Sequence, residues 1–81
     1  MGAVDLAARF SGLGSEPDQQ GNYVGWLLWQ CRRQRLMVLW FEDSAQQRDI
    51  HWRRLRWFQS ELSWERARST ALRQRSSAKS F

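Results

Sequence analysis

The C-terminal half of the chain contains no helix-breaking residue, and this feature constrains the fold most. Neither glycine nor proline occurs from Ser44 to Phe81. Ser44 is followed three residues later by Gln47, which is the capping-box pattern that satisfies backbone N–H groups at a helix start. We therefore predict one long amphipathic helix over residues 44–75, with residues 76–81 as a flexible tail.

At 100° per residue, the side chains of this helix sort onto two sides. The apolar side spans about half of the circumference, the width expected of a helix packed on a globular partner. It consists of Ile50, Leu55, Trp57, Phe58, Leu62, Trp64, Ala71 and Leu72. The opposite side collects Arg48, Trp52, Arg56, Gln59, Ser63, Arg66 and Thr70. A helix of this length is longer than the core that an 81-residue chain can form. Part of it must therefore project into solvent or contact another chain.

Residues 23–41 are compatible with two structures. The apolar runs YVGWLLW and LMVLWF flank a polar stretch, QCRRQR. On a helix their apolar residues would point all round, and their aromatic and β-branched content favours two buried strands. The polar stretch, however, lacks the Gly, Asn, Asp or Pro of a typical hairpin turn, and it contains good helix formers. We predict an α+β fold with a β-hairpin at 23–41 beneath the long helix, and the alternative is an all-α helical hairpin.

The N-terminal part is expected to be a short helix followed by a loop. Residues 3–10 can form two helical turns, which are too short to be stable unless they dock on the rest of the chain. Residues 11–22 concentrate Gly, Ser, Pro, Asp and Asn and are expected to form a loop. We therefore divide the chain into an N-terminal segment and loop (1–22), one small domain (23–75) and the tail. Eighty-one residues are near the lower size for a single core.

Charge is concentrated in the C-terminal half. The chain carries a formal charge of +5, which favours acidic partners such as nucleic acid or an acidic protein surface. Residues 1–29 hold one Arg and three acids, a net −2, whereas residues 45–75 hold eight Arg and three acids, a net +5. Arginine suits phosphate recognition and stacking on aromatic rings. A GC-rich coding sequence explains the excess of arginine over lysine equally well.

No combination of residues predicts an enzyme. His51 is the only histidine and Cys31 the only cysteine, so neither a two-His metal site nor a Cys-pair site can form. Gly12-Leu13-Gly14 is a lone GxG without the rest of a phosphate-binding loop. We expect packed, structural roles for His51 and Cys31. We therefore expect no catalytic residues, no metal and no cofactor.

The exposed side of the long helix suggests nucleic-acid binding. Arginines one helical turn apart can contact successive phosphates, and an exposed tryptophan offers a face for base stacking. The candidate residues on the helix are Arg48, Trp52, Arg56, Gln59 and Arg66, and the middle of 23–41 adds Arg32, Arg33 and Arg35. We predict a small basic binding protein that contacts the phosphate backbone of RNA or DNA. A regulatory role is one form of this function. A solvated basic face without a ligand is the structural alternative.

The tryptophans suggest a second function class. Trp and Arg are enriched at the energetic centres of protein interfaces. Five tryptophans exceed what an 81-residue core readily encloses: Trp26, Trp29, Trp40, Trp57 and Trp64. The alternative prediction is therefore an accessory subunit that docks onto a larger protein complex, soluble or membrane-associated. Association of several copies of the chain through the long helix is another interaction that this alternative includes.

Localisation is predicted from missing signals. The N-terminus lacks a basic region followed by a long apolar run, and its sixth residue, Leu6, does not fit the myristoylation pattern. The sequence contains no run of 18 apolar residues, the length that a transmembrane helix requires. We expect an intracellular, cytoplasmic protein that is soluble or peripheral, without a transmembrane segment.

Overall fold

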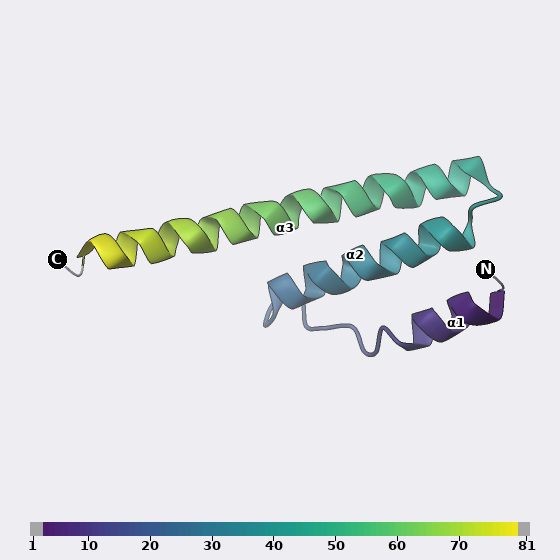
Figure 1. Cartoon of the computed structure of the whole chain (residues 1–81), viewed down its shortest axis with the longest axis horizontal. Helices are drawn as coiled ribbons and strands as arrows, with labels where there is room; N and C mark the ends of the chain where they lie inside the picture. Colours follow the sequence, from purple (N-terminus) through teal and green to yellow (C-terminus); the bar gives the residue numbers. More distant parts are fainter. Residues whose placement is uncertain (1–2, 80–81) are drawn as a thin grey trace.

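The chain folds into three helices. The structure is a computed structural model that describes residues 3–79 and the side chains of residues 5–75. Its helices are α1 (Ala3–Ser11), α2 (Tyr23–Trp40) and α3 (Ala45–Lys79), and no strand occurs within 3–79 (Figure 1). The predicted α+β fold with a β-hairpin is therefore wrong, and the alternative, an all-α helical hairpin, describes α2 and α3. The N-terminal helix agrees with its prediction.

Helix α2 lies in the middle of the molecule. It runs antiparallel to α3, to which residues 41–44 connect it, and α1 lies along its other side (Figure 1). Both α1 and α3 pack on α2. Because α2 is covered on two sides, apolar residues that point all round suit it as well as they suit a buried strand. This double cover is the physical reason that the prediction for residues 23–41 failed.

A local cap defines where α2 begins. The side-chain oxygen of Asn22 accepts a hydrogen bond from the backbone N–H of Gly25 at 3.1 Å, which satisfies one of the free donors at a helix N-terminus. A Cβ atom at position 25 would overlap the Asn22 amide, so glycine lets the cap close. The backbone N–H of Trp26 then bonds to the Asn22 carbonyl at 2.9 Å.

The core is a narrow seam between α2 and α3. Leu27 of α2 is fully buried, and Leu55 and Leu62 of α3 are buried against α2. The spacing from His51 through Leu55 and Phe58 to Leu62 is four, three and four residues, which is the pattern of a helix packed on one other helix. The predicted apolar side of half a circumference is therefore too wide.

Two tryptophans expected on the packed side lie outside this seam. Trp57 is 54% exposed and Trp64 is 69% exposed. On a helix Trp57 and Trp64 lie about 130° and about 150° from the centre of the seam, and a single partner helix covers only one narrow strip of α3. Neither residue belongs to the core, so the expectation that they pack within the chain was wrong, and their role at a partner surface stays a prediction.

The seam contains a buried polar pair. The Nδ1–H of His51 donates to the side-chain oxygen of Gln34 at 2.7 Å, and the Phe41 ring stacks on the imidazole with centroids 5.4 Å apart. Burial lowers the pKa of His51, and the positive charges of Arg54 and Arg33 lower that pKa further. The imidazole therefore packs as a neutral ring, in line with the structural role that we expected.

The N-terminal loop is fastened to α2 through one carboxylate. Glu16 accepts hydrogen bonds from the indole N–H of Trp26 at 2.9 Å and from the amide of Gln30 at 3.3 Å. At the other end of α2, the rings of Phe10 and Trp40 meet edge to face at 6.0 Å. These contacts bind α1 and the loop to the face of α2 that α3 leaves uncovered.

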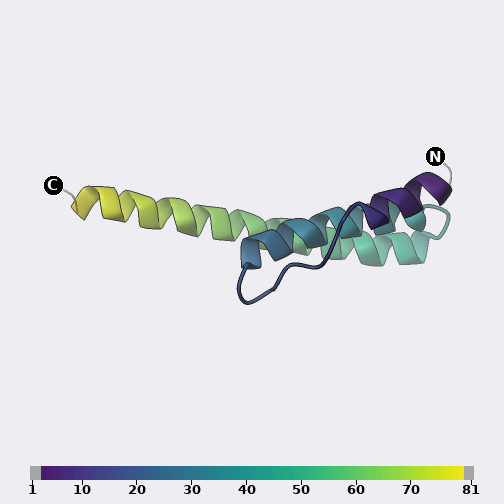
Figure 2. The same cartoon turned by 90° about the horizontal axis from the view of Figure 1, so that it is seen from below.

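The C-terminal part of α3 projects beyond α2 (Figures 1 and 2). At 1.5 Å per residue, the 35 residues of α3 span about 52 Å, whereas the 18 residues of α2 span about 27 Å. All side chains from Arg66 to Arg75 are exposed. The helix continues to Lys79, four residues past the predicted end, and Ser80 and Phe81 of the predicted tail lie outside the described residues. Within residues 3–79 no helix combines the length and apolar character needed to span a membrane.

The seam predicts a contrast between two identical substitutions. Leu27→Ala should lower the free energy of unfolding by about 2–5 kcal/mol, because it removes a fully buried side chain and leaves a cavity. Leu72→Ala, at an exposed position of α3, should change it by no more than about 0.5 kcal/mol. Urea denaturation followed by circular dichroism measures both values. Similar losses for the two variants would contradict the position of the seam.

The buried imidazole predicts a pH dependence of stability. Because the pKa of His51 lies below its ordinary value of 6.5 in the folded chain, the unfolded chain binds a proton that the folded chain rejects. The free energy of unfolding should therefore fall as the pH is lowered from about 7.5 to about 5.5, across the ordinary imidazole range. Replacing His51 by Gln removes the titration and should flatten the profile, and an unchanged profile would contradict the assignment.

Candidate nucleic-acid interface

Side chains from α2 and α3 line one open groove between the two helices. Arg32 and Arg35 come from α2, and Gln59 and Arg66 come from α3. The remaining lining residues are Leu28, Cys31, Leu62 and Ser63. We call this surface the arginine groove. The antiparallel hairpin thus brings together four predicted nucleic-acid contacts that lie up to 34 residues apart in the sequence.

The arginine groove continues in both directions along α3. Toward the connection between α2 and α3, Arg35 and Gln59 also line a hollow with Trp52. Toward the free end of α3, Arg66 lines a further hollow with Arg73. Trp52, Gln59, Arg66 and Arg73 are spaced by seven residues and therefore follow one side of the helix. Their span of 21 residues is about 31 Å long.

The charge along this surface is mainly positive. Four arginines line it, namely Arg32, Arg35, Arg66 and Arg73, and the acid Glu65 lines it only at the Arg73 end. On the floor, burial raises the pKa of the Cys31 thiol, and the nearby Arg35 and Arg66 act in the opposite direction. A neutral thiol leaves the charge of the arginines uncompensated. The arrangement favours an anionic ligand, because arginine presents a planar fork of donors to phosphate or carboxylate oxygens.

Two predicted contacts on α3 are engaged within the chain. The guanidinium of Arg56 lies 5.6 Å from the centroid of the Trp52 ring, a cation–π distance that stabilises the orientation of the indole. Trp52 remains 46% exposed. Arg48 donates to the backbone carbonyl of Glu42 at 3.1 Å, and so it stabilises the connection between α2 and α3. Arg48 and Arg56 therefore flank the groove without lining it.

Arg33 does not belong to the groove. It is two residues from Arg35, which places the two side chains about 200° apart around α2. Arg33 is half-buried and its charge acts on His51. The prediction that Arg32, Arg33 and Arg35 form one contact assumed a hairpin turn. On a helix only Arg32 and Arg35 face α3 on this side.

Arg73 was missed as a candidate, although the sequence contains a signal for it. The spacing of seven that links Trp52, Gln59 and Arg66 continues to Arg73. In the predicted helix, which ends at residue 75, Arg73 falls in the last turn. Once α3 continues to Lys79, Arg73 lies within the helix and extends the row.

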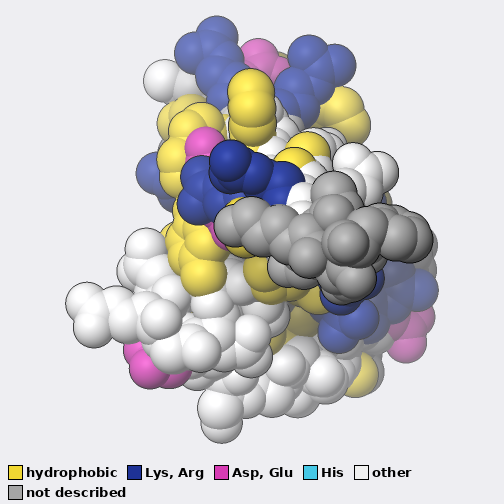
Figure 3. Space-filling view, turned by 90° about the vertical axis from the view of Figure 1, so that its left-hand side faces the viewer, with side chains coloured by type: hydrophobic (Ala, Val, Ile, Leu, Met, Phe, Trp, Pro, Cys, Tyr) yellow, Lys and Arg dark blue, Asp and Glu magenta, His cyan; other side chains and the backbone are white. Residues whose placement is uncertain are grey.

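The five candidate docking tryptophans divide into two groups. Of the three on α2, Trp26 contacts Phe58 and Glu16, and the Trp29 indole N–H is buried without a hydrogen-bond partner. Trp40 contacts the Phe10 ring but is still 48% exposed. Trp57 and Trp64 are exposed on α3, and only Trp57 contacts a ring, that of Phe58 at 5.2 Å. Viewed from the free end of α3, hydrophobic side chains reach the surface between arginines (Figure 3).

Neither a protein-family model, nor a curated protein, nor a solved structure matches the chain. Among the described side chains, no group of three or more His, Cys, Asp or Glu residues comes close enough together to hold a metal ion. The absence of catalytic residues and cofactors therefore stays a prediction from the sequence.

Proposed function

We propose that the chain is a small non-enzymatic nucleic-acid-binding protein that binds the phosphate backbone of RNA or DNA in the arginine groove. The observation that carries this proposal is the convergence of Arg32 and Arg35 from α2 with Arg66 from α3 around one groove. Trp52 lies at one end of the same surface and Arg73 at the other. The arginines and the exposed ring of Trp52 thus lie along a single line on the surface.

The arginines supply affinity through charge. Each guanidinium can donate two parallel hydrogen bonds to a phosphate, a geometry that lysine cannot reproduce. Each phosphate contact also releases condensed counterions from the polynucleotide, so binding weakens as the salt concentration rises. Arg32, Arg35, Arg66 and Arg73 offer four such contacts along the groove.

Trp52 supplies a stacking contact. A base can stack on an indole only when it is not already stacked within a duplex, so this residue favours single-stranded segments. The cation–π contact with Arg56 holds the ring beside the groove. A strand that follows the line from Trp52 to Arg73 would cover about 31 Å, enough for several nucleotides.

The arginine contacts predict the salt dependence of binding. Four phosphate contacts on a single strand give a slope of about −3 in a plot of log affinity against log salt. Replacing both Arg35 and Arg66 by Ala should reduce the magnitude of this slope by about 1.4, because two contacts are lost. Fluorescence anisotropy with a labelled single-stranded oligonucleotide measures both slopes.

A matched pair of substitutions controls for net charge. Arg9 on α1 and Arg53 on α3 are exposed and do not line the groove. Replacing both by Ala removes the same charge and should leave the slope nearly unchanged. Equal effects of the two double variants would mean that diffuse charge, and not the arginine groove, holds the strand. A slope near zero in the unaltered protein would refute the proposal.

Trp52→Ala predicts a different signature. Loss of a stacked base should cost about 1–3 kcal/mol of binding free energy, while the salt slope stays the same because no phosphate contact is lost. The same oligonucleotide titration provides the measurement, with Trp57→Ala as the control because Trp57 lies about 140° from Trp52 around α3. A change of slope in Trp52→Ala, or an equal loss in Trp57→Ala, would contradict the stacking role.

An accessory subunit of a larger complex is the second candidate function. The exposure of Trp57 and Trp64 favours it, because exposed aromatic side chains flanked by arginines are typical of protein interfaces. The two candidates use different sides of α3, so variants on one side leave the other intact. Absence of polynucleotide binding at low salt would make the accessory role the preferred function.

A further inference from the structure

The outer flank of α3 carries an exposed apolar strip. Its residues are spaced by seven along the helix and are all exposed: Ile50, Trp57, Trp64 and Ala71. We call this surface the tryptophan strip. It lies on the opposite flank of α3 from Trp52, about 140° around the helix, and is therefore separate from the arginine groove. Within the described chain no helix packs on it.

A hollow of small residues adjoins the largest side chain of the strip. Ser60, Ser63 and Ala67 form a shallow depression beside the indole of Trp64. Ser60 and Ala67 lie one turn before and one turn after Trp64, so a large projection and a small-residue hollow occur together on one helix. Such a surface is complementary to a second copy of itself in a two-fold arrangement, where each projection fills the hollow of the other copy.

We propose that two copies of the chain associate through the tryptophan strip, with their α3 helices antiparallel and the two-fold axis near Trp64. In this register, residues at equal distances on either side of position 64 face each other. Trp57 and Ala71 are each seven residues from Trp64, so each large Trp57 faces the small Ala71 of the other copy. The strip is thus complementary in size on both sides of the axis, and at the axis the two Trp64 indoles lie side by side, each next to the hollow of the other copy.

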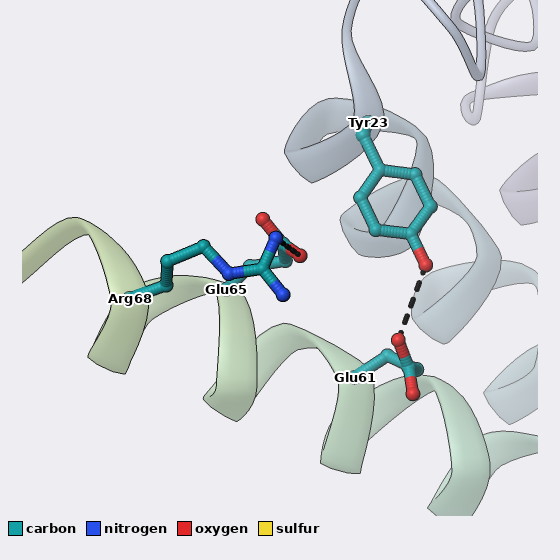
Figure 4. A network of polar contacts seen from close by, with 4 residues as sticks. All are labelled: Tyr23, Glu61, Glu65 and Arg68. Atoms are coloured by element: carbon teal, nitrogen blue, oxygen red, sulfur yellow. Dashed lines mark hydrogen bonds and ion pairs between the residues drawn. The ribbon is translucent and has the colours of Figure 1, made fainter.

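The charged residues nearest the axis are also complementary. Glu61 and Arg68 lie three and four residues from Trp64 in opposite directions, so each Glu61 comes near Arg68 of the other copy. Within one chain Glu61 accepts a hydrogen bond from Tyr23 at 3.3 Å, and Arg68 pairs with Glu65 at 3.4 Å (Figure 4). The carboxylate of Glu61 retains acceptor capacity for a guanidinium of a second chain.

The exposed area is compatible with a specific but moderate dimer. At 54% and 69% exposure, and with roughly 250 Å² per tryptophan, Trp57 and Trp64 together present about 300 Å² in each copy. Two copies would bury about 600 Å² of this surface, more than a third of the ~1,600 Å² of a standard interface. Ile50, Ala71 and the aliphatic stems of arginines add to this area. The projection of α3 beyond α2 (Figure 1) leaves room for the second helix.

The ends of this arrangement carry like charges. Arg53 and Arg75 are each eleven residues from Trp64, so they approach each other across both ends of the helix pair. Salt screens this repulsion and the attraction between Glu61 and Arg68 alike. Association of the two copies should therefore change little as the salt concentration rises, whereas polynucleotide binding should decrease steeply. The different responses distinguish failure of this inference from failure of the proposed function.

Sedimentation equilibrium of the full chain tests the inference. We expect a monomer–dimer equilibrium, and Trp64→Ala should lower the association constant by about 30-fold or more, the loss expected for a central interface residue. Ala67→Arg, which fills the hollow and leaves Trp64 in place, should have a similar effect. Trp52→Ala is the matched control, because it removes an exposed tryptophan from the other flank of α3, and it should leave association unchanged.

Three results would overturn the inference. The first is a monomer at every concentration, which would assign the strip to a different protein partner. The second is a loss of association in Trp52→Ala equal to that in Trp64→Ala. The third is normal association of Ala67→Arg, because a self-complementary contact needs the hollow as well as the projection. Circular dichroism of each variant verifies that the helical fold is retained, since every substituted side chain is exposed.

Discussion

The packing of α2 between α1 and α3 is the interaction on which the rest of the structure depends. Leu27 is fully buried at the centre of the seam with α3, and Glu16 and Phe10 attach the N-terminal segment to the outer face of α2. Because α1 and α3 pack on two sides of α2, the arginines of α2 lie at the edges of these contacts. Arg35 therefore faces α3 at the edge of the seam. The candidate interface is therefore a consequence of how the middle helix is covered.

The long helix could be predicted from sequence, and the middle helix could not. No glycine or proline interrupts α3, so local preferences alone specify it. In α2 the apolar residues point all round, a pattern shared by a buried strand and a central helix, and only tertiary contacts distinguish them. Gln30 and Gln34 made the middle of this segment resemble a turn. Their partners are Glu16 and His51, 14 and 17 residues away, and no local pattern indicates such pairs.

The same distinction applies to the candidate site. Helical spacing alone placed Trp52, Gln59 and Arg66 on one side of α3, and the structure agrees. The contribution of Arg35 depends on the antiparallel hairpin, and so it could be predicted only with the correct fold. The misassignment of Trp57 arose because a globular partner was assumed, whereas a single helix covers a narrower part of the circumference. Helix α3 thus divides into a buried seam, an arginine groove and an exposed tryptophan strip.

These three surfaces place the tryptophans in different environments, and their indole N–H groups can be observed separately by NMR. The most direct measurement is therefore a titration of ¹⁵N-labelled protein with a single-stranded oligonucleotide, in which the indole signals of the six tryptophans are followed. We expect the Trp52 signal to shift with added oligonucleotide, while the Trp57 and Trp64 signals respond only to protein concentration. Oligonucleotide-dependent shifts of Trp57 or Trp64 with an unchanged Trp52 signal would contradict this expectation.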